Sequence, residues 1–366
     1  MENGRSWAEV DLSCIVNNYN IYKHSAGKDV MAVVKANAYG HGSVAVAKAL
    51  QDEGVDLFAV ASINEAIELR ENGIKGLILI LGYTPPEKFD ELLKYDISQS
   101  IISEEYFETM LSTRKEYKVH VALDTGMNRI GIKAQYPEHC EEFIRKCSES
   151  MILEGVFTHL CVADTKGEEE VSFTKKQIAL FDNVLERVSD LDIPYRHCAN
   201  SAGGLIYESH FSNMDRLGII LYGLKPDNSF ELPVGIRPAM TWKSVVTMRK
   251  HILAGETVGY GRTFTADKDM DIGIISTGYA DGYNRLLSNK GYVLYKGEKL
   301  PIVGRVCMDQ FMVALKDSDA KQGDKVYLID TEKLTADDMA NMTGTIGYEI
   351  VCDISERVPR YYSEGE

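Results

Sequence analysis

The chain contains no long hydrophobic run, no block of basic residues and no cysteines at metal-ligand spacing, and each absence excludes a class of protein. No apolar stretch approaches the roughly 20 residues of a membrane helix, and no signal-peptide core follows the first residues, so we expect a soluble chain. The 366 residues include 40 Lys and Arg against 55 Asp and Glu. The resulting net charge of -15 disfavours nucleic acid and anionic membranes as partners.

The seven cysteines are an odd number scattered along the chain, without the pattern of a disulfide framework. Such usage is typical of reduced thiols. We therefore expect a cytoplasmic location.

The chain also lacks a G-x-G-x-x-G motif after its first predicted strand, which disfavours an open dinucleotide-binding sheet. Instead, short apolar runs alternate with longer amphipathic segments between residues 8 and 224, a pattern typical of a TIM-like (β/α)₈ barrel. The eight predicted strands are Val30–Val34, Leu57–Ala61, Leu77–Leu81, Ile97–Ile102, Val119–Leu123, Ile152–Phe157, Tyr195–Ala199 and Met214–Leu221. The predicted helices between them include Ser43–Glu53, Ile63–Asn72, Glu87–Tyr95, Pro137–Ser148 and Phe173–Leu191.

After Pro238 the pattern changes to strands separated by turn residues, such as Asn289-Lys290-Gly291 and Lys296-Gly297-Glu298. We therefore predict two domains: a barrel over residues 8–237 and a mainly β domain over 238–366, with which an N-terminal strand within 1–12 is expected to pack. The predicted strands are Thr241–Thr247, Asp271–Ser276, Tyr292–Tyr295, Pro301–Val306, Phe311–Leu315 and Lys325–Ile329, with one helix, Ala336–Met342, after a Thr335 cap.

In such a barrel, reactive groups lie just beyond the carboxyl ends of the strands. Lys35 follows the first predicted strand, where an amine at the rim can form an imine with an aldehyde. Ser201 and the glycines behind it can direct a hydroxyl and backbone N–H groups at a phosphate, and Arg129 can bind a carboxylate. With His159 after the sixth predicted strand and Arg216 on the eighth, this combination predicts a site for an anionic ligand that carries an aldehyde.

Taken singly, each of these groups has an ordinary structural explanation. A histidine after a buried strand is more often packed than functional, an arginine at a rim more often forms a salt bridge, and Asn200-Ser201 can simply cap the next helix. Their joint position at the ends of neighbouring strands favours one shared cavity.

These motifs resemble those of the alanine racemase family, whose members are pyridoxal-phosphate enzymes of fold type III. The resemblance covers essentially the whole chain. It implies a racemase that converts L-alanine into D-alanine for peptidoglycan, with pyridoxal 5'-phosphate (PLP) as cofactor. The motifs that carry the resemblance are Trp7–Leu12, Val33–Gly42, Asp124–Gly131, Asn200–Ala202, Arg216–Gly223, Gly259–Thr263, Gly278–Gly282, Gly304–Gln310 and Arg357–Arg360.

Carried over position by position, the resemblance implies that Lys35 is the imine lysine and one proton-transfer base, and that Tyr260 is the opposite base. Because the phenol would come from the second subunit, the resemblance also implies a homodimer with shared active sites. The implied cofactor-binding residues are Lys35, Tyr39, His159, Asn200, Ser201, Arg216, Gly218, Ile219 and Tyr348. The implied substrate-binding residues are Arg129, Met308 and Tyr279, and those of the entryway are Asp164, Arg285 and Arg305, with no metal ligand.

One position departs from the family pattern. Many alanine racemases carry a carbamylated lysine two residues before the aspartate of the Asp-Thr-Gly-Met motif, and its negative charge orients the arginine. Here that position is Ala122. Asp124, Asn128 or a bound anion are the candidates for holding Arg129 in its place.

Three alternative functions remain open at this point. The racemase domains of vancomycin-resistance serine racemases share nearly all of these motifs, and the chain would then be the cytoplasmic domain of a longer membrane protein. Tyr348 favours alanine over serine. A barrel-only protein of PLP homeostasis would have no use for the β domain with Tyr260, and a fold-type III decarboxylase would carry a cysteine-bearing catalytic segment that is not recognisable here.

Overall fold

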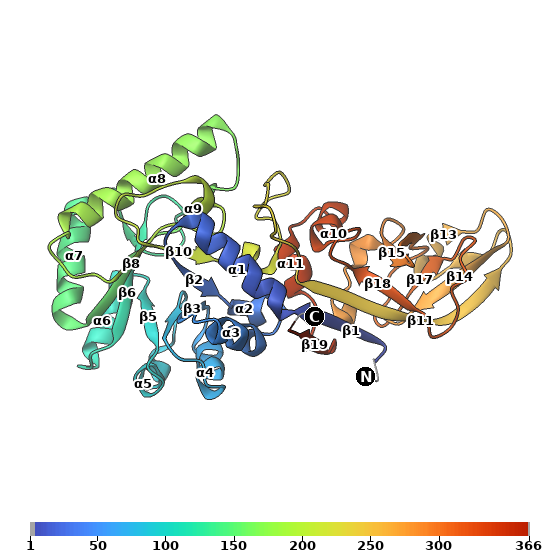
Figure 1. Cartoon of the computed structure of the whole chain (residues 1–366), viewed down its shortest axis with the longest axis horizontal. Helices are drawn as coiled ribbons and strands as arrows, with labels where there is room; N and C mark the ends of the chain where they lie inside the picture. The colour runs from blue at the N-terminus through green and yellow to red at the C-terminus, as the bar shows by residue number, and fades with distance from the viewer. Residues whose placement is uncertain (1–3, 365–366) are drawn as a thin grey trace.

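A closed barrel of eight parallel strands forms one end of the molecule, and a β-rich part forms the other (Figure 1), in the computed structural model that describes residues 4–364. Strand β5 pairs with both β4 and β6, and this last pairing closes the ring. The predicted (β/α)₈ barrel is thereby confirmed. Its strands are β2 (Asp29–Val33), β3 (Leu57–Val60), β4 (Leu77–Ile80), β5 (Ser98–Ile101), β6 (Lys118–Asp124), β8 (Ile152–Phe157), β9 (Tyr195–His197) and β10 (Met214–Leu217).

Helices cover the outside of this barrel, and side-chain caps fix where several of them begin. The Ser62 hydroxyl accepts from the Glu65 N–H at the start of α4, and Asp11 caps α1 by accepting from Cys14 N–H. The sequence pattern did not single out α1. The helices are α1 (Leu12–Ala26), α3 (Ser43–Asp52), α4 (Ile63–Glu71), α5 (Phe89–Lys94), α6 (Glu104–Ser112), α7 (Pro137–Ser150), α8 (Glu168–Arg187) and α9 (Gly203–Ile206).

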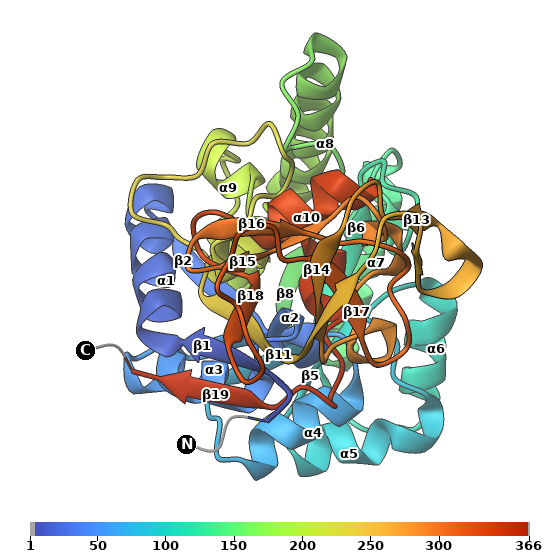
Figure 2. The same ribbon diagram turned by 90° about the vertical axis from the view of Figure 1, so that its right-hand side faces the viewer.

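The β-rich part is organised around β11 (Met240–Ile252), a 13-residue strand that pairs with β1, β14 and β18. Strand β1 (Ser6–Asp11) also pairs in parallel with β19 (Arg360–Ser363), so the two ends of the chain lie side by side (Figure 2). Residues 1–3 of the expected N-terminal strand lie outside the described residues. The other elements are β12 (Thr257–Val258), β13 (Phe264–Thr265), β14 (Met270–Ile275), β15 (Tyr292–Tyr295), β16 (Glu298–Pro301), β17 (Phe311–Ala314), β18 (Lys325–Ile329), α10 (Ala336–Thr343) and α11 (Gly347–Cys352).

Three predicted strands are wrong in extent by more than two residues, and one of them, Thr241–Thr247, continues as β11 to Ile252. Lys296 and Gly297 both have positive φ, 51° and 83°, and form a two-residue turn that pairs Glu298–Pro301 with β15, so β16 ends where the predicted strand Pro301–Val306 begins. The strand predicted to reach Leu221 stops at Leu217, because the chain turns at Gly218 into the 3₁₀ turn η2 (Ile219–Tyr222).

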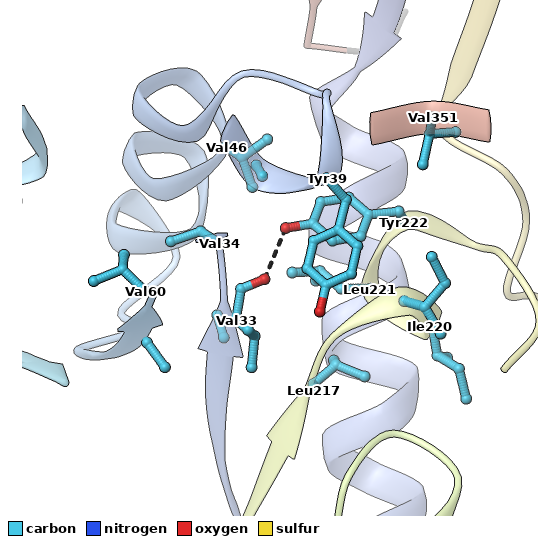
Figure 3. Packing of buried hydrophobic residues seen from close by; sticks show 14 of the residues in the cluster. Val33, Val34, Tyr39, Val46, Val60, Leu217, Ile220, Leu221, Tyr222 and Val351 are labelled. Atoms are coloured by element: carbon cyan, nitrogen blue, oxygen red, sulfur yellow. Dashed lines mark hydrogen bonds between the residues drawn. The ribbon is translucent and has the colours of Figure 1, made fainter. Parts of the chain in front are cut away.

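The segment after β2, labelled α2 (Lys35–Tyr39), is a left-handed turn. Its residues Ala36 to Tyr39 all have φ between 52° and 54°, a conformation that costs roughly 1–2 kcal/mol for each non-glycine residue. Buried contacts hold its far end: the Tyr39 ring lies 5.0 Å from that of Tyr222, whose hydroxyl donates to Val33 O at 2.9 Å (Figure 3). Gly40 follows and touches the Val351 carbonyl of α11, so the turn is also braced by the β-rich part.

Gly40 offers a direct test of that bracing. A Cβ at Gly40 would lie 2.1 Å from Val351 O, whereas a Cβ at Gly54, which has a similar φ of 86° against 80°, would meet no atom within 4 Å. Both alanine substitutions incur the backbone strain of positive φ, but only Gly40→Ala adds a clash. We expect Gly40→Ala to lower the free energy of unfolding by at least about 1 kcal/mol more than Gly54→Ala does, measured by urea denaturation. Equal losses would show that the contact with α11 is dispensable.

Candidate active site

A cavity of about 390 Å³ opens at the carboxyl ends of the barrel strands. It combines three cationic side chains with a small-residue turn and an apolar wall. Ala122 lines it too, together with residues that the sequence did not single out, among them Phe157 and Thr158. The predicted site residues that line it are Lys35, Tyr39, Arg129, His159, Asp164, Asn200, Ser201, Arg216, Gly218, Ile219 and Tyr348.

Lys35 stands between the end of β2 and the left-handed turn, with its side chain in the cavity. Burial lowers the pKa of its amine below the ordinary value, and the positive charge of Arg129 lowers it further, while the Glu65 carboxylate acts in the opposite direction. A lysine with a lowered pKa holds a larger fraction of neutral amine near pH 7. It is therefore better suited to act as a nucleophile or as a base.

Tyr39, Ser201 and Gly218 form a narrow polar cradle on one side of the cavity. The Ser201 hydroxyl accepts from Gly218 N–H at 2.8 Å, and a Cβ at Gly218 would lie 2.8 Å from the Tyr39 hydroxyl. Only glycine leaves this space open. The Asn200 side chain accepts from Gly203 N–H and donates to Leu160 O, so it holds the shape of the turn.

Arg216 is buried on the floor of the cavity and donates to several acceptors. Its guanidinium donates to His197 Nδ1 at 2.8 Å, to His159 Nδ1 at 3.2 Å and to Thr158 O at 2.6 Å. Burial lowers its pKa to about 10, so it remains a cation near neutral pH. Because a charged guanidinium only donates, both histidine nitrogens must accept, which fixes the tautomer of each neutral ring.

The same constraint extends to a histidine that the sequence analysis missed. His197 Nε2 must carry its proton, and it lies 2.9 Å from His120 Nδ1, which therefore accepts. Burial lowers the pKa of both rings, that of His120 to about 3, so both are neutral. His120 inside the apolar run of β6 and His197 at the end of β9 were the available sequence signal. They lie inside the barrel below Arg216 and continue its hydrogen bonds.

The structure tests two of the candidates for holding Arg129, Asp124 and Asn128. Asp124 Oδ1 accepts from Gly126 and Asn128 N–H, both at 3.0 Å, and Asn128 Nδ2 donates to Gly126 O. Both side chains therefore shape the loop that carries Arg129. Within residues 4–364, neither one pairs with the guanidinium.

The remaining predicted site residues form a second group on the β-rich part, away from this cavity. Backbone hydrogen bonds from Tyr279 to Cys307 and from Ala280 to Met308 join two of the three segments that carry them, and the third contains Tyr260. Large side chains in this group are exposed, Tyr260 to 71% and Met308 to 53%. The group consists of Tyr260 in η3 (Tyr260–Arg262), Tyr279 in η4 (Tyr279–Asp281), Arg285 in η5 (Arg285–Leu287), Arg305 and Met308.

Within the described residues there is no cluster of metal-binding side chains and no helix long and apolar enough to cross a membrane.

The barrel with a cavity lysine, joined to a β-rich part that carries an exposed tyrosine, defines the barrel class of amino-acid racemases. The profile "Alanine racemase, N-terminal domain" matches residues 10–226, and "Alanine racemase, C-terminal domain" matches residues 239–362. The chain belongs to the alanine racemase family, and it is an isomerase of the racemase type.

Similar proteins extend along the whole chain. An alanine racemase of Halothermothrix orenii is 41% identical over 98% of this chain and 96% of its own length, and alanine racemase 1 of Bacillus subtilis is 42% identical over 98% and 93%. A structure of the Clostridium difficile alanine racemase superposes with a TM-score of 0.91, 38% identity and coverage of 99% and 97%. One of the Bacillus anthracis enzyme with bound L-Ala-P gives a TM-score of 0.89, 35% identity and coverage of 98% and 95%.

The effect of the Arg129 charge on the pKa of Lys35 can be measured. Because a neighbouring cation lowers a lysine pKa, we expect Arg129→Ala to raise the pKa of Lys35 and to shift its acylation by acetic anhydride to higher pH. Arg129→Lys keeps the charge and serves as the matched control. The measurement is peptide mass spectrometry of the cofactor-free protein labelled across a pH series. Coincident profiles for the two variants would contradict this electrostatic role.

Proposed function

We propose that this protein interconverts L-alanine and D-alanine with PLP as cofactor, in a homodimer whose active sites are shared between subunits, and so supplies D-alanine for peptidoglycan. The observation that carries the proposal is the joint placement of the Lys35 amine, the Ser201–Gly218 cradle and the Arg216 guanidinium in one cavity. We also propose a boundary between the domains near residues 237 and 238, and a cytoplasmic location on the basis of seven free cysteines.

The residues present fit PLP. A cavity of about 390 Å³ is suited to a small phosphorylated ring and a small amino acid. Because Gly218 has no Cβ, the space beside the Tyr39 and Ser201 hydroxyls stays open, and a phosphate could bind there. Lys35 would hold the aldehyde and Arg216 the ring nitrogen, with His159 beside the ring. When bound, the cofactor supplies a conjugated ring that delocalises the electron pair left when the α-proton is removed. The phosphate would be held by Tyr39, Ser201, Gly218, Ile219 and Tyr348, with Asn200 holding the turn that carries Ser201.

Racemisation requires removal of a proton from one face of the α-carbon and its return on the other. We assign the first face to Lys35 Nζ, whose lowered pKa favours the neutral, proton-accepting form. The other face is assigned to the hydroxyl of Tyr260. Arg129, with the backbone of Met308, would bind the substrate carboxylate and so fix which bond points at each base.

The exposure of Tyr260 supports a shared site. Its side chain is 71% exposed and does not line the cavity of its own chain, so a base at this position has to act on another copy. A head-to-tail homodimer brings each phenol to the partner's cavity and gives two equal sites. Tyr279, Arg285 and Arg305 would then narrow the entrance opposite Asp164, which favours a small amino acid.

Racemisation of L-alanine against L-serine is the primary test, measured as D-amino acid formed with a D-amino-acid oxidase assay. We expect faster turnover of alanine, because Tyr348 lines the cavity. A pocket discriminates weakly against one added hydroxyl, so turnover of serine at a lower rate is also expected. Lys35→Ala should abolish both activities, and Lys48→Ala, a change at an exposed lysine on α3, should leave them unchanged. Faster turnover of serine would assign the chain to serine racemases instead.

Subunit mixing tests the shared sites. A mixed dimer of Lys35→Ala and Tyr260→Phe subunits contains one intact site, built from Lys35 of one chain and Tyr260 of the other. After complete exchange in an equal mixture, half of the dimers are mixed and each has one of two sites, so we expect about a quarter of the parent activity. Native mass spectrometry checks that exchange has occurred. An inactive mixture that contains mixed dimers would refute sharing.

A further inference from the structure

Glu65 connects two barrel loops through three backbone hydrogen bonds. Its Oε1 accepts from Ala36 N–H at 2.7 Å, in the turn directly after Lys35. Its Oε2 accepts from Ala61 N–H at 2.7 Å and from Ser62 N–H at 3.1 Å, at the start of α4. The two loops follow the neighbouring strands β2 and β3. A capping-box glutamate ordinarily serves only its own helix, and this one also binds the adjacent loop.

The loop that it binds requires support. Residues 36–39 form a left-handed turn without glycine, which is about the most costly backbone that a non-glycine chain adopts. At its far end, Asn37 Oδ1 accepts from Ser43 N–H at 2.9 Å, and Tyr39 packs against Tyr222. At its near end, beside Lys35, the side-chain contact is the bond from Ala36 N–H to Glu65.

The charge of Glu65 also acts on the Lys35 amine. The carboxylate raises the lysine pKa, whereas burial and Arg129 lower it. Burial is the largest cause of the lowered pKa, and Arg129 and Glu65, which lie on different loops, act on the amine in opposite directions.

We propose that Glu65 is a positioning residue for Lys35: it fixes the backbone turn from which the lysine projects and counterbalances Arg129 at the amine. This inference rests on the role of Lys35 in the proposed function. Glu65 does not line the cavity, so it acts through Lys35 and not on substrate.

A glutamine cannot replace this carboxylate. Both carboxylate oxygens accept backbone N–H groups, so an amide at position 65 must turn its NH₂ towards either Ala36 or the Ala61–Ser62 pair, where donor meets donor. One loop is released whichever way the amide points. Glu65→Asp keeps the charge but is one methylene shorter. It therefore distinguishes the effect of the charge from the effect of the hydrogen bonds to the two loops.

The test compares Glu65→Gln and Glu65→Asp with Glu68→Gln, a matched change at an exposed position on the same helix. Three quantities are measured: kcat and KM for L-alanine, the pH profile of Lys35 acylation by acetic anhydride in the cofactor-free full-length chain, and the thermal midpoint. We expect Glu65→Gln to lower kcat by about tenfold to a hundredfold with little change in KM, and to shift the Lys35 profile to lower pH. Glu65→Asp should keep the profile near that of the parent while kcat falls.

Two results would overturn the inference. One is a kcat within twofold of the parent in all Glu65 variants. The other is a loss of activity with a lower thermal midpoint but an unchanged Lys35 profile in Glu65→Gln, because a purely structural role would produce that pattern. Failure of the proposed function is separate: it would appear as activity retained in Lys35→Ala, whereas the acylation profile of the Glu65 variants is read without turnover.

Discussion

The left-handed turn of residues 36–39 is the constraint on which the site depends. Lys35 stands directly before this turn, at the end of β2, and its side chain lines the cavity. The turn is costly, so its surroundings must over-determine it. Tyr222 packs on Tyr39 from the end of the barrel (Figure 3). Gly40 lies against the Val351 carbonyl of α11. The β-rich part thus supports the turn next to the lysine of its own chain. It also carries the tyrosine that we propose acts in the cavity of the partner.

Arg216 imposes a second constraint, because it fixes which nitrogen donates and which accepts in a series of buried hydrogen bonds. Since the guanidinium only donates, His197 and His159 must accept from it, and His197 then donates to His120, so one buried cation sets the tautomers of three rings. The last nitrogen of this series, His120 Nε2, has no hydrogen-bond partner among the described residues, and the Glu154 carboxylate lies 3.9 Å away. Neutral groups therefore accept the hydrogen bonds of the cation at the cavity floor, and within residues 4–364 no carboxylate forms a salt bridge with it.

Periodicity alone predicted the barrel, because inward-facing apolar runs recur at the spacing of β/α units. It also located the lysine, the arginines and the serine turn, since chemistry at strand ends is visible in sequence. It did not predict the reversed turn, because nothing in Ala36 or Ala38 favours positive φ, and tertiary contacts impose it. Nor did it single out Glu65, which reads as an ordinary capping box until the neighbouring loop is placed beside it. The boundary error at Pro301 is local, because the turn at Lys296-Gly297 was predicted but the strand after it begins at Glu298 and not at Pro301.

The division of the site residues into two groups has a physical reason. The cavity already contains the cationic groups that bind an anion, and a base on the opposite face of the substrate must approach from outside the barrel. A flexible arm from the same chain would lose conformational entropy each time it closed. In the proposed homodimer, a rigid β-rich part of a second copy would present its phenol from a fixed loop and would lose that freedom once, on assembly. Tyr260 and Met308 are exposed on this part, and exposed apolar surface is unfavourable on an isolated chain. Such an assembly would bury it.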